Sequence, residues 1–168
     1  MLDHNFNSSR FTVGIEEELM LLDPETFDLT DGIETILAAV PAERAEFVKP
    51  ELFQSVLEVA TSPCATVTEA AAELAEMRRL VCGIAADNGM LVGAAGTHPF
   101  ALCDEQSIVE RERYVDLMAD LGFIASRELI FGTHVHVGID DPERAIYVAD
   151  GIRRHLPLLL ALSSNSPF

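Results

Sequence analysis

The sequence predicts an α+β domain with a mostly antiparallel sheet. Segments with the two-residue alternation of strands mix with segments of helical periodicity, without the regular strand–helix–strand rhythm of a parallel α/β fold. No internal repeat and no linker-like stretch divides the 168 residues. We therefore expect a flexible N-terminus over residues 1–10 and a single unit over residues 11–168.

The first strand is expected over Phe11–Leu22, which is rich in β-branched and aromatic residues and stops at the turn signal Asp23-Pro24. Strand periodicity places Glu16 and Glu18 together on one face. Glu17 falls on the opposite, apolar face, where it needs a partner or a route to water. The apolar residues on both sides of this acidic run favour a central strand.

An extended segment over Phe47–Thr61 carries two more carboxylates, Glu51 and Glu58. Their neighbours are apolar enough to be buried, and buried carboxylates are rare unless they are paired or bind a metal. A spacing of seven residues does not put both on one face of a regular strand. We therefore expect a bend or bulge at Gln54-Ser55.

Capping and turn signals mark the remaining elements. They are a helix near 33–40; a helix over 67–88 with a capping box at Thr66 and Glu69 and a stop at Asn88-Gly89; a short buried strand over 90–95; a charged amphipathic helix over 107–121; a strand over 129–139; and a last helix opened by Asp141-Pro142 and kinked or divided by Pro157.

The strand over 129–139 carries a second polar pair, His134 and His136, on one face, while its other face is apolar. Gly132 and Gly138 bracket the pair and permit the close approach of a ligand or another backbone. Imidazole binds several metals, and carboxylates suit Mg²⁺ or Mn²⁺. Four carboxylates and two histidines on or beside strands predict a polynuclear metal site, which is a common arrangement for phosphoryl transfer.

Composition excludes several classes of partner. The net charge is −17 and Lys49 is the only lysine, which argues against binding to nucleic acid or to an anionic membrane. No segment approaches the ~18–20 apolar residues of a membrane span, and residues 1–10 lack the apolar core of a signal peptide. A cytoplasmic location is therefore expected, with the three cysteines as free thiols.

Five motifs in a fixed order resemble the type 2 glutamate–cysteine ligase family of ATP-dependent carboxylate–amine ligases. They are GIEEE (Gly14–Glu18), ELFQSVLEVAT (Glu51–Thr61), GTHPF (Gly96–Phe100), GTHVHVG (Gly132–Gly138) and LLALSSNSPF (Leu159–Phe168). The resemblance implies the N-terminal part of a glutamine synthetase-like catalytic domain. Its sheet would be curved and mostly antiparallel, with helices on one side, and it would be incomplete.

The resemblance also implies roles for particular residues, none of them a protein nucleophile. The implied metal ligands are Glu16, Glu18, Glu51, Glu58 and His134. His136 would lie near the nucleotide phosphates, and Thr97 and His98 would border the amino-acid site.

The implied substrates are ATP, glutamate or a similar carboxylate, and cysteine or another amine, with Mg²⁺ or Mn²⁺ as cofactor. Attack of the acid on the γ-phosphate of ATP would give an acyl phosphate, which the amine would then capture. Members of the family continue into a second half that carries the basic residues for ATP. We therefore expect weak or absent activity for this chain alone, and either homo-oligomerisation or association with a C-terminal half.

Two other functions stay open from the sequence. A non-catalytic interaction or regulatory subunit could retain the ligase fold without its activity. A metal-dependent hydrolase could use His134 and His136 as its first ligands, although only one further histidine, His155, follows them.

Overall fold

The computed structural model describes residues 11–122, 124, 127 and 129–164, so the predicted flexible N-terminus lies outside the described residues. The strands are β1 (Thr12–Leu22), β2 (Val48–Pro50), β3 (Val56–Ala60), β4 (Leu91–Gly93) and β5 (Thr133–Gly138). The α-helices are α1 (Ile33–Ala39), α2 (Val67–Asp87), α3 (Glu112–Leu121), α4 (Pro142–Ile152) and α5 (Leu156–Leu162). Short 3₁₀ turns lie at η1 (Ala42–Phe47), η2 (Cys103–Glu105) and η4 (Arg153–His155).

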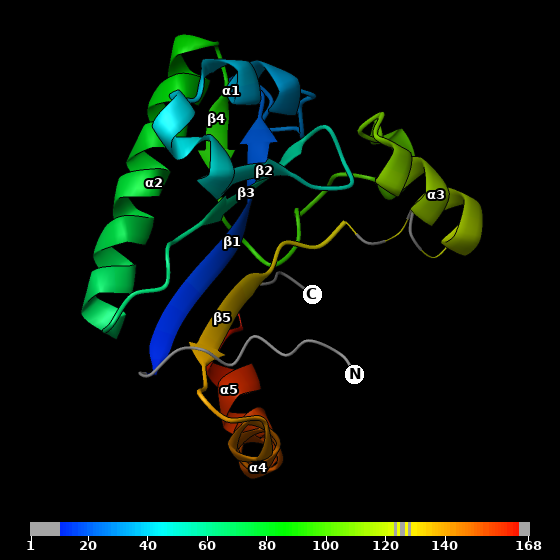
Figure 1. Cartoon of the computed structure of the whole chain (residues 1–168). Helices are drawn as coiled ribbons and strands as arrows, with labels where there is room; N and C mark the ends of the chain where they lie inside the picture. The colour runs from blue at the N-terminus through cyan, green and yellow to red at the C-terminus, as the bar shows by residue number, and fades with distance from the viewer. Residues whose placement is uncertain (1–10, 123, 125–126, 128, 165–168) are drawn as a thin grey trace.

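The five strands form one antiparallel sheet in which β1 is central, as predicted (Figure 1). On one side β1 pairs with β3, which pairs in turn with β2. On the other side β5 pairs with the N-terminal half of β1, and β4 pairs with its C-terminal end. The α+β prediction is confirmed. Because β1 is 11 residues long, it can pair with every other strand of the sheet except β2.

Helix α2 covers one face of the sheet and supplies much of the core (Figure 1). Met77 and Val81 are buried on its inner face and belong to the same apolar cluster as Leu19 and Leu57 of the sheet. Its predicted start is confirmed, because the Thr66 side chain accepts a hydrogen bond from the Glu69 backbone N–H at 3.1 Å.

Glu17 has the partner that its place on the apolar face requires. The side chain is buried, with 6% of its surface exposed, and it accepts hydrogen bonds from Nε and Nη2 of Arg78 on α2. This pair ties α2 to the middle of the sheet. Because side chains alternate along a strand, Glu16 and Glu18 must then face away from α2.

The predicted helix over 107–121 is shorter in the structure and begins at Glu112. Residues 107–109 are extended instead, because they pair with the chain before β3. The Gln54 N–H donates to the Ser107 carbonyl at 2.9 Å, and the Val109 N–H donates to the Leu52 carbonyl at 2.9 Å. The helical periodicity of a sequence carries no information about backbone pairing between distant segments.

The strand predicted over 129–139 is confined to β5, and its apolar face is not covered within the described part of the chain. Val135 and Val137 are 64% and 55% exposed. Leu129 and Phe131, just before the strand, are buried. The strand predicted over 90–95 is likewise reduced to β4, where Leu91 is 39% exposed.

The C-terminal helices extend beyond β5, away from the rest of the sheet (Figure 1). Asp141 caps α4 as predicted, with Oδ1 accepting a hydrogen bond from the Arg144 N–H at 2.8 Å. The expected division of this helix occurs at η4, just before Pro157. Among the described residues, no helix is long and apolar enough to cross a membrane.

Candidate metal centre

Strand register brings the predicted site residues together on the face of the sheet that α2 leaves open. Glu18 of β1 lies directly opposite Glu58 of β3, and Glu16 of β1 lies directly opposite His134 of β5. His136 is opposite Gly14, one step further along the same face. Directly paired positions share a face, so one sheet surface carries all five residues that the motifs single out in these strands.

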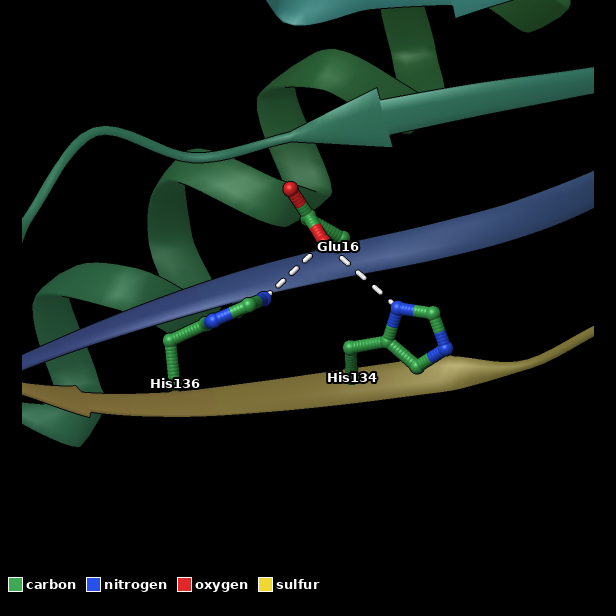
Figure 2. A group of neighbouring side chains, drawn as sticks. All are labelled: Glu16, His134 and His136. Carbon is green, nitrogen blue, oxygen red and sulfur yellow. Dashed lines mark hydrogen bonds and ion pairs between the residues drawn. The ribbon is translucent and has the colours of Figure 1, made fainter. Parts of the chain in front are cut away.

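The first group of possible metal ligands consists of Glu16, His134 and His136, whose ligand atoms lie within 4.8 Å of one another (Figure 2). Oε2 of Glu16 is 2.9 Å from Nε2 of His136 and 3.5 Å from Nδ1 of His134. The hydrogen bond to His136 is the largest cause that lowers the pKa of the Glu16 carboxyl. Glu16 therefore offers an ionised carboxylate between two imidazoles.

The second group consists of Glu18, Glu58 and His134, again within 4.8 Å of one another. Two carboxylates directly opposite each other on antiparallel strands repel unless a cation lies between them. Glu58 is 6% exposed, and Oε2 of Glu18 accepts a hydrogen bond from the Gly132 N–H at 2.7 Å. Since His134 belongs to both groups, the two potential sites are adjacent.

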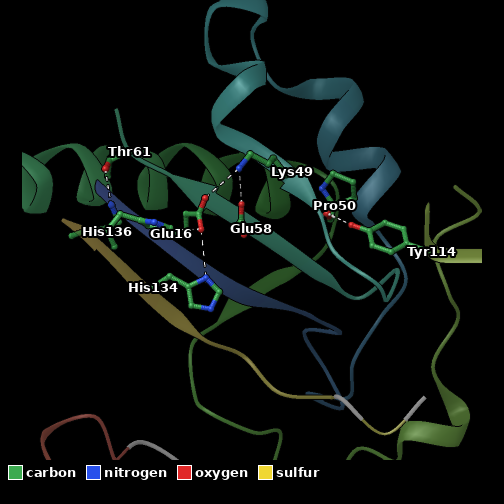
Figure 3. A network of polar contacts seen from close by, with 9 residues as sticks. Glu16, Lys49, Pro50, Glu58, Thr61, Tyr114, His134 and His136 are labelled. Atoms are coloured by element: carbon green, nitrogen blue, oxygen red, sulfur yellow. Dashed lines mark hydrogen bonds and ion pairs between the residues drawn. The ribbon is translucent and has the colours of Figure 1, made fainter. Parts of the chain in front are cut away.

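Lys49 is a site residue that motif reasoning did not identify (Figure 3). It lies opposite Glu58 in the β2–β3 pair, and its Nζ is 2.9 Å from Oε1 of Glu58 and 3.5 Å from Oε1 of Glu16. One ammonium group thus contacts one carboxylate from each ligand group. The hydrogen bond to Glu58 raises the pKa of Lys49, which keeps the side chain charged.

Glu51 is close to these carboxylates but belongs to neither ligand group. The predicted bend at Gln54-Ser55 is present as a turn, and Glu51 lies before it, at the end of β2. Burial raises the pKa of the Glu51 carboxyl, and the negative charges of Glu58 and Glu18 raise it further. Glu51 therefore lies within electrostatic range of the ligand carboxylates.

Thr97 and His98 lie in the segment between β4 and η2. Thr97 forms an isolated bridge with Ile130. His98 is buried, with Nε2 2.9 Å from the Phe27 carbonyl and Nδ1 accepting the Ala101 N–H at 2.9 Å. His98 therefore joins two loops through its contacts with their backbones. Neither Thr97 nor His98 belongs to a ligand group.

Three cavities open beside the ligand groups. One of about 290 Å³ is lined by Glu16, His136 and Thr61, among others. A second, of about 220 Å³, is lined by Glu18, Glu51, His134, Arg113 and Tyr114, among others. A third, of about 470 Å³, is lined by Glu17, Glu18 and Gly132, among others. The potential metal positions therefore lie beside spaces of the size that parts of small substrates occupy.

The two groups differ in their donors. The second group offers two carboxylates and one imidazole, and its oxygens suit Mg²⁺ or Mn²⁺, whereas the first group offers one carboxylate and two imidazoles, a set that also suits transition metals. The buried Glu58 already has a cationic partner in Lys49, so its burial does not by itself require a metal. His155, which a hydrolase would need as a further ligand, belongs to neither group.

Replacing Gly132 with alanine is expected to weaken Mn²⁺ binding about tenfold, as measured by titration calorimetry. An added Cβ would lie 3.1 Å from Nε2 of His134, so this ring would have to move by a few tenths of an ångström, and it would be in ordinary contact with Oε2 of Glu18 at 3.5 Å. Gly83→Ala is the matched control, because a Cβ there meets no atom within 4 Å. Equal Mn²⁺ affinity in the two variants would contradict this placement of the ligands.

Comparisons with known proteins identify the family of the chain. The family model described as "Glutamate-cysteine ligase family 2(GCS2)" matches residues 12–168. A protein of Rubrobacter xylanophilus named "Putative glutamate--cysteine ligase 2-1" is 44% identical over 167 residues, which are 99% of this chain and 44% of that protein. A Herpetosiphon aurantiacus protein named "Putative glutamate--cysteine ligase 2" is 45% identical over 158 residues, 94% of this chain and 41% of its own.

A solved structure is also similar in fold. The glutamate–cysteine ligase of Francisella tularensis, crystallised in complex with AMP, superposes with a TM-score of 0.58 at 15% identity. The match covers 91% of this chain and 31% of that one. The chain thus spans less than half the length of these similar proteins. By its sequence over residues 12–168, it belongs to the glutamate–cysteine ligase family 2.

Proposed function

We propose that this chain forms the metal-binding part of an ATP-dependent carboxylate–amine ligase that joins glutamate to cysteine. One observation carries the proposal. Two ligand groups share His134 on an open sheet face, and their residues line neighbouring cavities. Glu16, Glu18, Glu51, Glu58 and His134 would hold Mg²⁺ or Mn²⁺, and His136 would lie next to the nucleotide phosphates.

The proposed reaction needs no protein nucleophile. An oxygen of the glutamate γ-carboxylate attacks the γ-phosphorus of ATP, and the bond to the β-phosphate oxygen breaks to release ADP. The cysteine amine then attacks the acyl carbon, loses a proton and expels phosphate. Cys64 is poorly suited to compete as a nucleophile, because burial raises the pKa of its thiol.

The residues of this chain would position the reacting groups. Bound divalent cations would supply the positive charge that phosphoryl transfer requires. Hydrogen bonds fix two of the ligands in advance: His136 orients Glu16, and the Gly132 N–H orients Glu18. Such preorganisation places the oxygen ligands before the substrates arrive.

The complete activity would require more polypeptide than this chain contains. The chain spans about 44% of the length of the R. xylanophilus relative. Its site face is rich in carboxylates, with Lys49 and Arg113 as basic residues beside it. We propose that further chain, or another subunit, supplies positive charge for ATP and covers the apolar surface of β5, α4 and α5.

A chimera tests the proposal. This chain replaces the matched segment of the R. xylanophilus relative, and the intact relative is assayed beside it. We expect ADP release that requires glutamate, cysteine and Mg²⁺ together. ADP release that is indifferent to both amino acids, in a chimera that folds as well as the intact relative, would contradict the ligase assignment.

Calorimetry with the 168-residue chain separates the ligase from a non-catalytic subunit. We expect Mn²⁺ to bind, because each ligand group has three side chains within the chain, and Mg–ATP to bind more weakly than it binds to the chimera. If neither Mn²⁺ nor Mg–ATP binds to the folded chain or the chimera, a regulatory or interaction role is favoured instead.

A further inference from the structure

Lys49 occupies the space between the two ligand groups. Its Nζ lies 2.9 Å from Glu58 of one group and 3.5 Å from Glu16 of the other. Across the sheet, Lys49, Glu58 and Glu18 occupy directly paired positions on β2, β3 and β1. The ammonium group is thus part of the same polar row as the carboxylates (Figure 3).

The ion pair between Lys49 and Glu58 can be broken from the Lys49 side, because only Glu58 is buried. Glu58 is nearly buried, with 8% of its side chain exposed, whereas the side chain of Lys49 is 47% exposed. Lysine places a single point charge on a flexible stem, and β2 is a strand of three residues at the edge of the sheet. The ammonium can therefore turn toward solvent while Glu58 stays in place.

We propose that Lys49 is a positioning residue that stands in for a divalent cation on Glu58 and is displaced when that cation binds. This inference rests on the proposed metal site. In metal-free protein, the ammonium would keep Glu58 and Glu16 in their places and offset their repulsion. A divalent cation on Glu58 would repel the ammonium at short range, and this repulsion favours release of the contact. Lys49 would thus preserve the empty site and lower its affinity for metal.

Substitution of Lys49 tests whether its charge competes with the cation or only supports the site. We expect Lys49→Met to bind Mn²⁺ on the order of tenfold more tightly than the wild-type chain, because the competing charge is gone. Lys49→Arg, which keeps the charge, should stay near the wild-type affinity. Arg153→Met is the control for net charge, since Arg153 lies in η4 with a side chain that is 75% exposed. Free Mn²⁺ is measured by electron paramagnetic resonance.

Three results would overturn the inference: equal or weaker Mn²⁺ binding by Lys49→Met, the same gain in Arg153→Met, or no Mn²⁺ binding by either wild type or Lys49→Met. The last would also remove the proposed metal site. Mn²⁺ binding that is unchanged by Lys49→Met would remove the role of Lys49 alone, so the two failures can be distinguished.

The full wild-type chain offers a second test that needs no variant at Lys49. Because Lys49 is the only lysine, reductive methylation with ¹³C-formaldehyde gives one dimethyl-lysine resonance and keeps the charge. The labelled N-terminal amine is distinguished by its titration near pH ~8. We expect diamagnetic Mg²⁺ to shift the lysine resonance in step with its binding. A resonance that does not move at Mg²⁺ saturation would overturn the displacement.

Discussion

Replacing Glu16 and Glu18 together with glutamine is expected to abolish tight Mn²⁺ binding to the chain and to lower turnover of the chimera by at least ~100-fold. Glutamine keeps the size of each side chain but removes one negative charge from each ligand group. Loss of a hydrogen-bonding neighbour of a metal ligand already costs roughly 10–100-fold in other proteins, so loss of two ligands should cost more. Calorimetry measures binding, and ADP release measures turnover.

The control for this double variant is Glu43→Gln with Glu46→Gln. Both residues are exposed on η1, and the pair removes the same formal charge from the chain. We expect the control to bind Mn²⁺ as the wild type does. Melting temperatures of the metal-free proteins establish that both variants fold. Normal turnover of the chimera with Glu16→Gln and Glu18→Gln would remove the metal assignment.

Arg78→Met is expected to lower the free energy of unfolding by about 2–3 kcal/mol. The substitution leaves the carboxylate of Glu17 buried among apolar side chains without its cationic partner. The expected loss is below the roughly 3–5 kcal/mol of a fully buried pair, because half of the Arg78 side chain is exposed and water can reach the gap. Urea denaturation of the metal-free chain measures the change.

Arg79→Met provides the matched comparison, since Arg79 is the next residue on α2 and is exposed. We expect it to change stability by less than about 0.5 kcal/mol. Adding Glu17→Leu to Arg78→Met should recover most of the lost stability, because no buried charge remains. Equal losses in Arg78→Met and Arg79→Met would show that the Glu17–Arg78 pair does not stabilise the fold.

Local pattern in the sequence was sufficient to predict which face each β1 and β5 residue occupies. The two-residue period of a strand places Glu16 with Glu18 and His134 with His136, and it sets Glu17 apart. Since these rules concern one strand at a time, they hold whatever lies next to it. The central position of β1 followed from the same apolar pattern and is confirmed. Of the two alternatives left open for Glu17, a partner or a route to water, the structure shows a partner.

The neighbours across the sheet could not be predicted in this way, because register depends on pairing between distant segments. Lys49 shows the difficulty. A tight turn at Gln54-Ser55 would pair Glu51 with Glu58, whereas the wider connection in the structure shifts the pairing by two residues and sets Lys49 opposite Glu58. The signal that could have identified Lys49 was a single lysine beside two carboxylates in an apolar segment.

The role of the GTHPF segment could not be predicted from the local sequence pattern either. Both ring nitrogens of His98 contact backbone groups, including a carbonyl 71 residues earlier in the chain. A histidine that joins loops and a histidine that contacts substrate look the same in sequence. The family resemblance correctly predicted the fold, and the roles of Thr97 and His98 toward an amino acid stay predictions.

The central claim is that a divalent cation binds at the side chains of β1, β3 and β5. The most direct test is the effect of substoichiometric Mn²⁺ on the histidine ring signals of the 168-residue chain in ¹H–¹³C correlation spectra. Paramagnetic Mn²⁺ broadens the resonances of nearby nuclei. We expect the His134 and His136 signals to disappear first, while those of His98 and His155 persist. The fifth histidine, His4, is left out of the comparison. Uniform broadening of the other four signals, or loss of the His98 or His155 signal before those of His134 and His136, would contradict the proposed site.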